Sequence, residues 1–172
     1  IIEGPSLYSE MTAIENLEVQ RLQRGIPGKE NLDHVLALVH LDHAGKKKVK
    51  NFSLGMRQRL ALAIALLGTP EFLVLDEPIN GLDPVGILEL RNLLKSLNKE
   101  MGITILISSH ILSELNQLAT KYGILSHGEL MQEIDAKELE KQCQKHLYLK
   151  VSDASKVASL LELELHTHNY RV

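Results

Sequence analysis

The chain has 172 residues, a formal net charge of −3 and an apolar fraction of 44%. This length suffices for one hydrophobic core with a small appended domain, and the apolar fraction excludes a generally disordered chain. The negative charge predicts no general attraction to nucleic acid, and no apolar stretch approaches the roughly 20 residues that a membrane-spanning helix needs. The single cysteine, Cys143, cannot form a disulfide within the chain, which fits a reducing compartment.

The first seventy residues have helical spacing of their apolar side chains. This spacing predicts helices over residues 12–24, 31–41 and 54–67. Thr12 and Ser53 stand where the first and third of these helices begin, and their hydroxyls can cap free backbone amides there. Gly68 and Pro70 end the third helix.

After Pro70 the pattern alternates between short apolar runs and helices. The runs are typical of strands buried on both faces of a parallel sheet. We expect strands over 72–75 and 103–107, and helices over 84–100 and 110–120. Asp83 and Pro84 suit the start of the first of these helices. The second is expected to bury Ile111, Leu112, Leu115, Leu118 and Ala119. The fold class is therefore α/β, with right-handed crossovers between parallel strands.

The remaining chain is predicted to form a small α+β appendage. A hairpin is expected over residues 122–126 and 129–134, joined at His127-Gly128, followed by a helix that Asp135 and Glu138 would cap. A strand over 147–151, a helix over 154–163 and a last extended piece resemble the start of a β-α-β unit. We therefore expect three domains, residues 1–70, 71–140 and 141–172.

Two adjacent carboxylates, Asp76 and Glu77, follow the first predicted strand. Strand ends in open α/β sheets point into the ligand crevice, so both side chains would be delivered there. One carboxylate can orient a hydrated metal ion while the other accepts a proton from water, as nucleotide hydrolysis requires. Taken alone, a strand that ends in a polar turn is the commoner explanation of such a pair.

The surrounding motifs change that interpretation. VLDEP at the first strand, NGLDP after it and SSH after the second strand together resemble the ATP-binding subunits of ABC transporters. The resemblance covers roughly residues 1–135. It implies that Asp76 is the metal-orienting Walker B residue and that Glu77 is the catalytic base. It also makes His110 the switch that contacts the γ-phosphate, and places Asp83 in the nucleotide-binding D-loop.

The family's signature motif, usually LSGGQ, would lie at Phe52–Met56. Ser53 and Gly55 match the motif, whereas Leu54 and Met56 depart from it. A serine cap and the first amides of a helix form an anion site, and glycine lets a phosphate approach the backbone. The resemblance assigns all four residues, 53 to 56, to nucleotide binding; an ordinary serine-capped core helix is the alternative.

The phosphate-binding loop G-x-x-x-x-G-K-S/T does not occur in the 172 residues. The string Gly25–Glu30 has the wrong glycine spacing, and no strand precedes it. The opening resembles the family's Q-loop, with Glu3 where glutamine is usual; this carboxylate would still orient a metal-bound water. We therefore expect a fragment truncated before the Q-loop, a partial P-loop NTPase of RecA-like fold that is inactive alone.

The resemblance implies a subunit that hydrolyses ATP with Mg²⁺ and powers export of a drug or antimicrobial peptide. Its partners would be a second nucleotide-binding domain, paired head to tail, and a transmembrane permease. Apolar side chains between Leu7 and Leu17 could contact that permease. The protein would be cytoplasmic, at the inner face of the membrane.

Other functions stay open at this point. One is a non-catalytic regulatory or binding module, and another is an ABC-type ATPase that does not act in transport. The basic run Lys46–Lys50 has no interleaved aromatic residues, so we interpret it as a solvated loop and expect no nucleic-acid partner. Bare sheet edges predict self-association. The transported substrate and the direction of transport are not encoded in any motif here.

Overall fold

A computed structural model describes residues 6–142, 150–164 and 166 of the chain. Contacts divide it into two compact units, Ile1–Ala119 and Thr120–Val172. The division into domains after residues 70 and 140 stays a prediction. No helix in the described part of the chain is long and apolar enough to cross a membrane. Glu3 lies outside the described residues.

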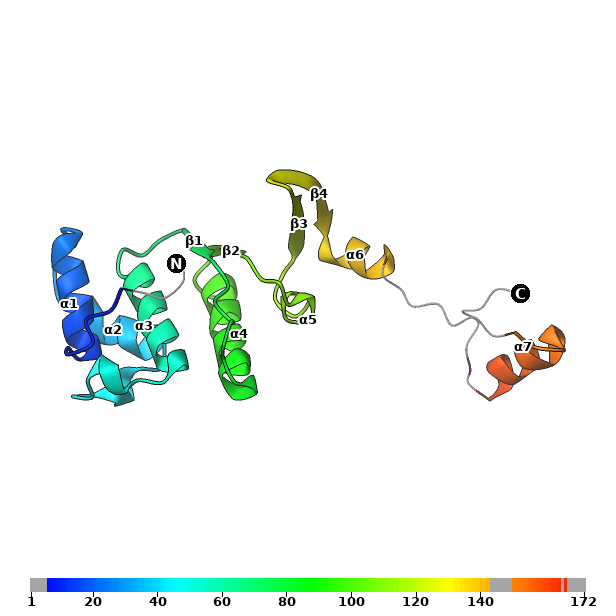
Figure 1. Cartoon of the computed structure of the whole chain (residues 1–172), viewed down its shortest axis with the longest axis horizontal. Coiled ribbons are helices and arrows are strands. Elements are labelled where there is room, and N and C mark those ends of the chain that lie inside the picture. Colours follow the sequence, from blue (N-terminus) through cyan, green and yellow to red (C-terminus); the bar gives the residue numbers. More distant parts are fainter. Residues whose placement is uncertain (1–5, 143–149, 165, 167–172) are drawn as a thin grey trace. The chain divides into compact units, whose positions relative to one another are not determined.

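The first unit begins with helices that pack together (Figure 1). They are α1 (Ala13–Gln23), α2 (Asn31–Leu38) and α3 (Leu54–Leu66), with short 3₁₀ turns η1 (Asp42–Ala44) and η2 (Val49–Asn51) between α2 and α3. The predicted caps are confirmed. The Thr12 hydroxyl accepts a hydrogen bond from the Glu15 amide, and the Ser53 hydroxyl accepts one from the Met56 amide.

Helix α2 is shorter than predicted. His40 adopts a left-handed backbone conformation (φ +56°), and the Leu41 amide donates to the Leu36 carbonyl at 2.8 Å. This turn brings Val39 and Leu41 into the core, where 0% and 1% of their surface is exposed. The helix therefore ends early because burying these two side chains requires the chain to reverse direction.

The predicted strand–helix–strand unit is confirmed. Strand β1 (Phe72–Leu75), helix α4 (Pro84–Lys99) and strand β2 (Thr104–Ile107) follow one another. The strands pair in parallel, with Phe72 opposite Thr104 and Leu75 opposite Ile107. The Asp83 carboxylate caps α4 by accepting from the Gly86 amide at 3.1 Å, as the sequence predicts.

The prediction that these strands are buried on both faces is wrong. Leu73 and Leu75 lie in the core with the buried leucines of α4. Phe72, Val74 and Leu106 point to the opposite face and are 54%, 52% and 58% exposed. The reason is that, among the described residues, only one face of this two-stranded sheet is covered.

The helix predicted over residues 110–120 is also wrong in length and burial. Only α5 (Leu112–Leu115) forms, and none of its residues is buried. Leu112 is 57% exposed, and Ile111, Leu115, Leu118 and Ala119 are only partly buried. The apolar spacing was sufficient to suggest a helix, but the described chain covers the segment only in part: Leu118 packs against the core and Leu112 stays exposed.

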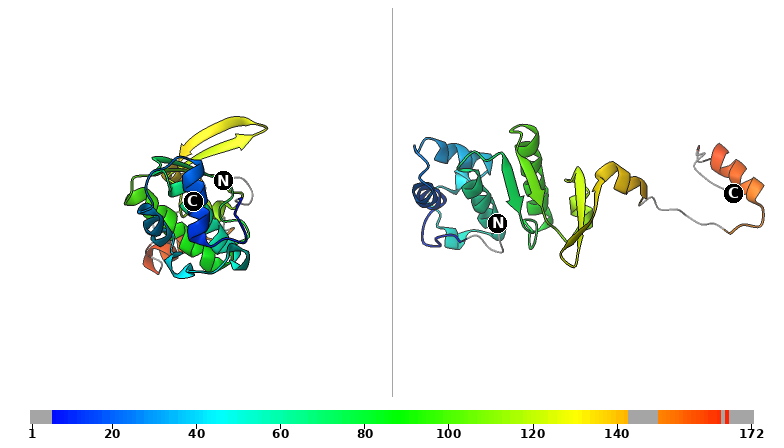
Figure 2. Two further views of the ribbon diagram at one scale, coloured as in Figure 1. Left: turned by 90° about the vertical axis from the view of Figure 1, so that its left-hand side faces the viewer. Right: turned by 90° about the horizontal axis from the view of Figure 1, so that it is seen from above.

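The second unit contains the predicted hairpin (Figure 2). Strands β3 (Lys121–Ser126) and β4 (Glu129–Asp135) pair antiparallel, and helices α6 (Ala136–Gln142) and α7 (Ala154–Leu163) follow. His127 and Gly128 both have positive φ, which the tight turn requires. Residues 147–149 of the predicted strand, and most of the last extended piece, lie outside the described residues.

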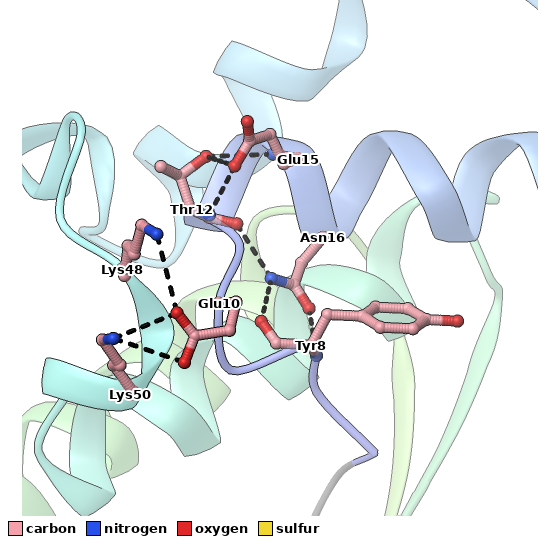
Figure 3. Close-up of polar contacts among 7 residues, drawn as sticks. All are labelled: Tyr8, Glu10, Thr12, Glu15, Asn16, Lys48 and Lys50. Carbon is pink, nitrogen blue, oxygen red and sulfur yellow. Dashed lines mark hydrogen bonds and ion pairs between the residues drawn. The ribbon is translucent and has the colours of Figure 1, made fainter.

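A buried asparagine fixes the chain's entry into α1 (Figure 3). Asn16 is 1% exposed. Its side-chain amide donates to the Tyr8 and Thr12 carbonyls at 3.1 and 2.9 Å, and its oxygen accepts from the Tyr8 amide at 2.8 Å. Buried polar groups need such partners, so Asn16 ties the incoming segment to the first turn of the helix. Leu17 beside it is fully buried, so the expected contact with a permease stays a prediction only for the exposed residues of that stretch.

Asn16→Ala is expected to lower the free energy of unfolding by about 1–3 kcal/mol, because it removes the three hydrogen bonds that the buried Asn16 side chain makes and leaves the Tyr8 amide without this partner. Urea unfolding followed by circular dichroism measures the loss. Asn92→Ala, at an exposed position of α4, is the control and should change stability by less than about 0.5 kcal/mol. Equal effects of the two substitutions would contradict a structural role for Asn16.

Part of the basic run is engaged within the protein (Figure 3). Lys50 and Lys48 lie 3.0 and 3.5 Å from the Glu10 carboxylate. The hydrogen bond from Lys50 is the main reason that the pKa of Glu10 is lowered from its ordinary value. Lys47 lies over the Phe52 ring, 5.9 Å from its centre. These contacts support the interpretation of the run as a loop of the folded protein.

Candidate functional site

The carboxylate pair lies where β1 ends and the chain turns. Asp76 directly follows the strand, and Glu77 comes next in a left-handed backbone conformation (φ +43°). The Asn80 amide donates to the Glu77 carbonyl at 3.1 Å, and Ile79 is 2% exposed. A buried side chain and a hydrogen-bonded turn therefore hold the backbone on which both carboxylates stand.

The end of β2 brings a second set of polar residues to the same edge. The Ser108 amide donates to the Leu75 carbonyl at 2.9 Å, which continues the parallel ladder one residue past β2. Ser108 and His110 thus lie beside Asp76 and Glu77. The parallel strand–helix–strand order predicted from the sequence is what brings these two strand ends to one edge.

Glu77 and His110 face each other. The Nδ1 atom of His110 lies 2.9 Å from Oε2 of Glu77. The histidine side chain is 65% exposed and the glutamate side chain 30%, so solvent reaches both. This pairing of a carboxylate with an imidazole can accept a proton and orient a water molecule. Their catalytic roles remain predictions.

Asp76 is held by a residue that the sequence reasoning did not single out. The Ser108 hydroxyl donates to Oδ1 of Asp76. Within the described residues, Oδ2 of Asp76 has no such hydrogen bond and stays available. Mg²⁺ is commonly bound by one or two carboxylates together with substrate phosphates, so a single Asp76 oxygen fits its preference. Ser108 is the first serine of the SSH motif, but only the fold shows what its hydroxyl contacts.

The predicted signature residues form a separate group at the start of α3. Ser53 is exposed, and its hydroxyl accepts from the Met56 amide at 3.2 Å. Leu54 is 41% exposed. A Cβ atom added to Gly55 would lie 3.5 Å from the Leu82 side chain, which is ordinary contact distance. Packing alone therefore does not demand glycine at position 55, and the assignment of this group to nucleotide binding remains a prediction.

The signature group packs against the loop that follows the carboxylate pair. The Gln58 side chain donates to the Asn80 carbonyl at 3.3 Å. A Cβ atom on Gly81, which has φ +74°, would lie only 2.9 Å from Leu54. The backbone conformation of Gly81 favours glycine, whereas the close contact is with the end of the exposed Leu54 side chain, which can shift. The start of α3 therefore lies against the predicted D-loop, residues 80–83, in the same chain.

A partly buried arginine connects the helices that precede and follow β2 in the sequence. Arg91 of α4 hydrogen-bonds Gln117 and pairs with Glu114 at 3.1 Å. The side chains of Arg91 and Glu114 are 14% and 19% exposed. The contact holds the segment that follows His110 against α4, and it was not predicted from the sequence.

Comparison with known proteins agrees with the motifs. Residues 1–80 match the family model described as ABC transporter. The whole chain is 49% identical to the bacitracin transport ATP-binding protein BcrA of Bacillus licheniformis and covers 56% of it. Over 133 residues, 77% of this chain, it is 46% identical to the lantibiotic transport ATP-binding protein SrtF of Streptococcus pyogenes and covers 57% of it. The chain therefore spans about half the length of these curated relatives.

Solved structures of ATP-binding cassettes share the fold. One is the ADP conformation of MJ1267, a cassette of an ABC transporter, with a TM-score of 0.70 and 26% identity over 78% of this chain and 59% of that one. Another is cbiO1 from Clostridium perfringens, part of the ABC transporter complex cbiONQ. It has a TM-score of 0.71 and 25% identity over 94% of this chain and 60% of that one. The predicted partial RecA-like α/β fold is confirmed.

Proposed function

We propose that the chain belongs to the ABC transporter family, whose model residues 1–80 match, and that the complete gene product is the ATP-binding subunit of an ABC transporter. Its cargo is a peptide antibiotic of the bacitracin or lantibiotic kind, as in the relatives BcrA and SrtF. The observation that carries the proposal is the 2.9 Å contact between Glu77 and His110 at the end of two parallel strands. A carboxylate that can act as a base, placed beside an imidazole at the carboxyl ends of parallel strands, is suited to activating a water molecule.

In this proposal each polar residue at the ends of β1 and β2 has a separate role. Glu77 accepts the proton of the attacking water, and His110 orients that water and the terminal phosphate. Asp76 holds Mg²⁺, which when bound neutralises charge on the phosphates. Catalysis then depends mainly on positioning, and a rigid strand end provides it.

The signature group, Ser53 to Met56, is proposed to bind the phosphates of ATP held by a second copy of the domain. Its exposure and its position at the start of α3 support this role, because helix N-termini attract anions. Asp83 and the D-loop would lie beside that contact, since Leu54 packs on Gly81. Glu3 is proposed as a further metal-orienting residue, on sequence resemblance alone.

The partners proposed are a second nucleotide-binding domain and a transmembrane permease, at the cytoplasmic face of the membrane. The solved relative cbiO1 is part of the transporter complex cbiONQ, which supports the general arrangement. Residues 1–172 alone are proposed to bind ATP weakly and not to hydrolyse it, since they contain no phosphate-binding loop. The three domains, residues 1–70, 71–140 and 141–172, are proposed on the motif order.

The test is expression of the complete gene with its permease in a bacitracin-sensitive host. The expected result is a higher inhibitory concentration of bacitracin or of a lantibiotic, together with Mg²⁺-dependent ATP hydrolysis by the purified protein. Hydrolysis without any change in susceptibility would reject the proposed cargo but keep the ATPase. Absence of hydrolysis in the complete protein would reject the function itself.

A further inference from the structure

One hydroxyl group contacts both residues of the carboxylate pair. The Ser108 hydroxyl donates its proton to Oδ1 of Asp76 and accepts a hydrogen bond from the Glu77 amide at 2.9 Å. A serine hydroxyl has one proton to donate and lone pairs with which to accept. Both capacities are used here, and the two hydrogen bonds link the end of β2 to the end of β1.

We propose that Ser108 is a positioning residue for ATP hydrolysis, which fixes the Asp76 carboxylate and the Glu77 backbone through one hydroxyl. This inference rests on the proposed function and adds to it a role for Ser108, a residue of the SSH motif to which the resemblance assigns no task. Ser108 itself contacts no reacting atom in this proposal. It acts through the two residues that do.

The backbone of Glu77 is the first reason that such a support is needed. Its φ of +43° places it in the left-handed region, which is uncommon for residues other than glycine. Conformations of this kind persist only where the surrounding structure holds them, and they cluster at functional sites. Hydrogen bonds hold Glu77 from two sides: its amide donates to Ser108, and its carbonyl accepts from Asn80.

The orientation of Asp76 is the second reason. The hydrogen bond from Ser108 engages Oδ1 of Asp76 and favours the orientation in which the other carboxylate oxygen points away from that bond. Groups that orient a metal-binding carboxylate typically matter almost as much as the carboxylate itself. The Glu77 carboxylate, by contrast, contacts His110 and not Ser108. One serine therefore supports both carboxylate residues without competing for the oxygen that contacts His110.

Two nearby serines allow the role of Ser108 to be tested against the loss of a hydroxyl group elsewhere, because neither of them contacts the carboxylate pair. Ser109 accepts a hydrogen bond from the Ile111 amide at 3.1 Å and contacts neither carboxylate. Ser113 is exposed on α5, with no side-chain hydrogen bond to the described residues. Ser113→Ala is therefore the matched control, and Ser108→Thr keeps a hydroxyl at the same position.

The first arm of the test measures the bond itself and does not depend on ATP hydrolysis. Amide hydrogen exchange of Glu77, followed by NMR in the 172-residue chain, should be about tenfold faster in Ser108→Ala than in the native chain. Ser108→Thr and Ser113→Ala should exchange as the native chain does. An unchanged Glu77 exchange rate in Ser108→Ala would overturn the proposal.

The second arm measures the consequence in the complete gene product. Ser108→Ala should lower kcat for ATP hydrolysis by about 10- to 100-fold and raise the Mg²⁺ concentration needed for half activity. The dissociation constant for ATP should stay within about twofold, and Ser108→Thr should restore most of kcat. A weaker ATP affinity with unchanged kcat would indicate a merely structural role and overturn the proposal. If the native protein does not hydrolyse ATP, the proposed function fails, and the exchange measurement still decides whether Ser108 holds the pair.

Discussion

Glu77→Gln in the complete gene product is expected to lower the rate of ATP hydrolysis by at least about 100-fold, the usual contribution of a positioned general base. Glutamine keeps the size of the side chain and can still hydrogen-bond the His110 ring, which lies 2.9 Å away. It cannot accept the proton of the attacking water. The affinity for ATP should therefore persist while turnover stops, and both are measured on the purified protein.

Glu71→Gln is the control for this substitution. Glu71 is an exposed carboxylate just before β1, at the opposite end of the strand from Glu77. Removing its charge should leave both hydrolysis and binding close to native values. Hydrolysis at the native rate in Glu77→Gln would remove Glu77 from the role of base, whatever the behaviour of the control.

His110→Ala is expected to have a loss of similar size, and the two losses should not add. The ring and the carboxylate are in direct contact, so each helps to place the water that the other uses. Groups that act as one unit show strong non-additivity in double-mutant cycles. The variant that carries both Glu77→Gln and His110→Ala should therefore be about as slow as the slower single variant.

His34→Ala serves as the matched control, because His34 is an exposed histidine on α2. It should hydrolyse ATP at the native rate. The cycle is measured as steady-state ATP hydrolysis at saturating nucleotide. If the losses of the two single variants multiply in the double variant, Glu77 and His110 act independently, and their contact in the structure has no catalytic meaning.

Local signals in the sequence were enough to predict most elements. Asp83 followed by Pro84 marks the start of α4 by capping and by a pre-set φ, and both are properties of the neighbouring residues alone. The same holds for Thr12 and Ser53 at the starts of α1 and α3. The meeting of Glu77 and His110 followed from parallel strand order, which places successive strand ends at one edge.

Features that depend on distant contacts could not be predicted in this way. An apolar run predicts burial, but which face is covered depends on what else packs there, and Val74 is 52% exposed. Helix α5 is short for the same reason, since apolar spacing needs a surface to pack against. The hydroxyl of Ser108 contacts residues more than thirty positions away, so its role appears only in the folded chain.

The sheet face that no described residue covers has a consequence for residues 1–172 when they are produced alone. Phe72, Val74 and Leu106 offer an apolar surface of the kind that chaperones and proteases recognise. Any binding partner that buries this surface stabilises the native state by mass action. Residues 1–172 produced without such a partner should therefore be prone to aggregation and proteolysis.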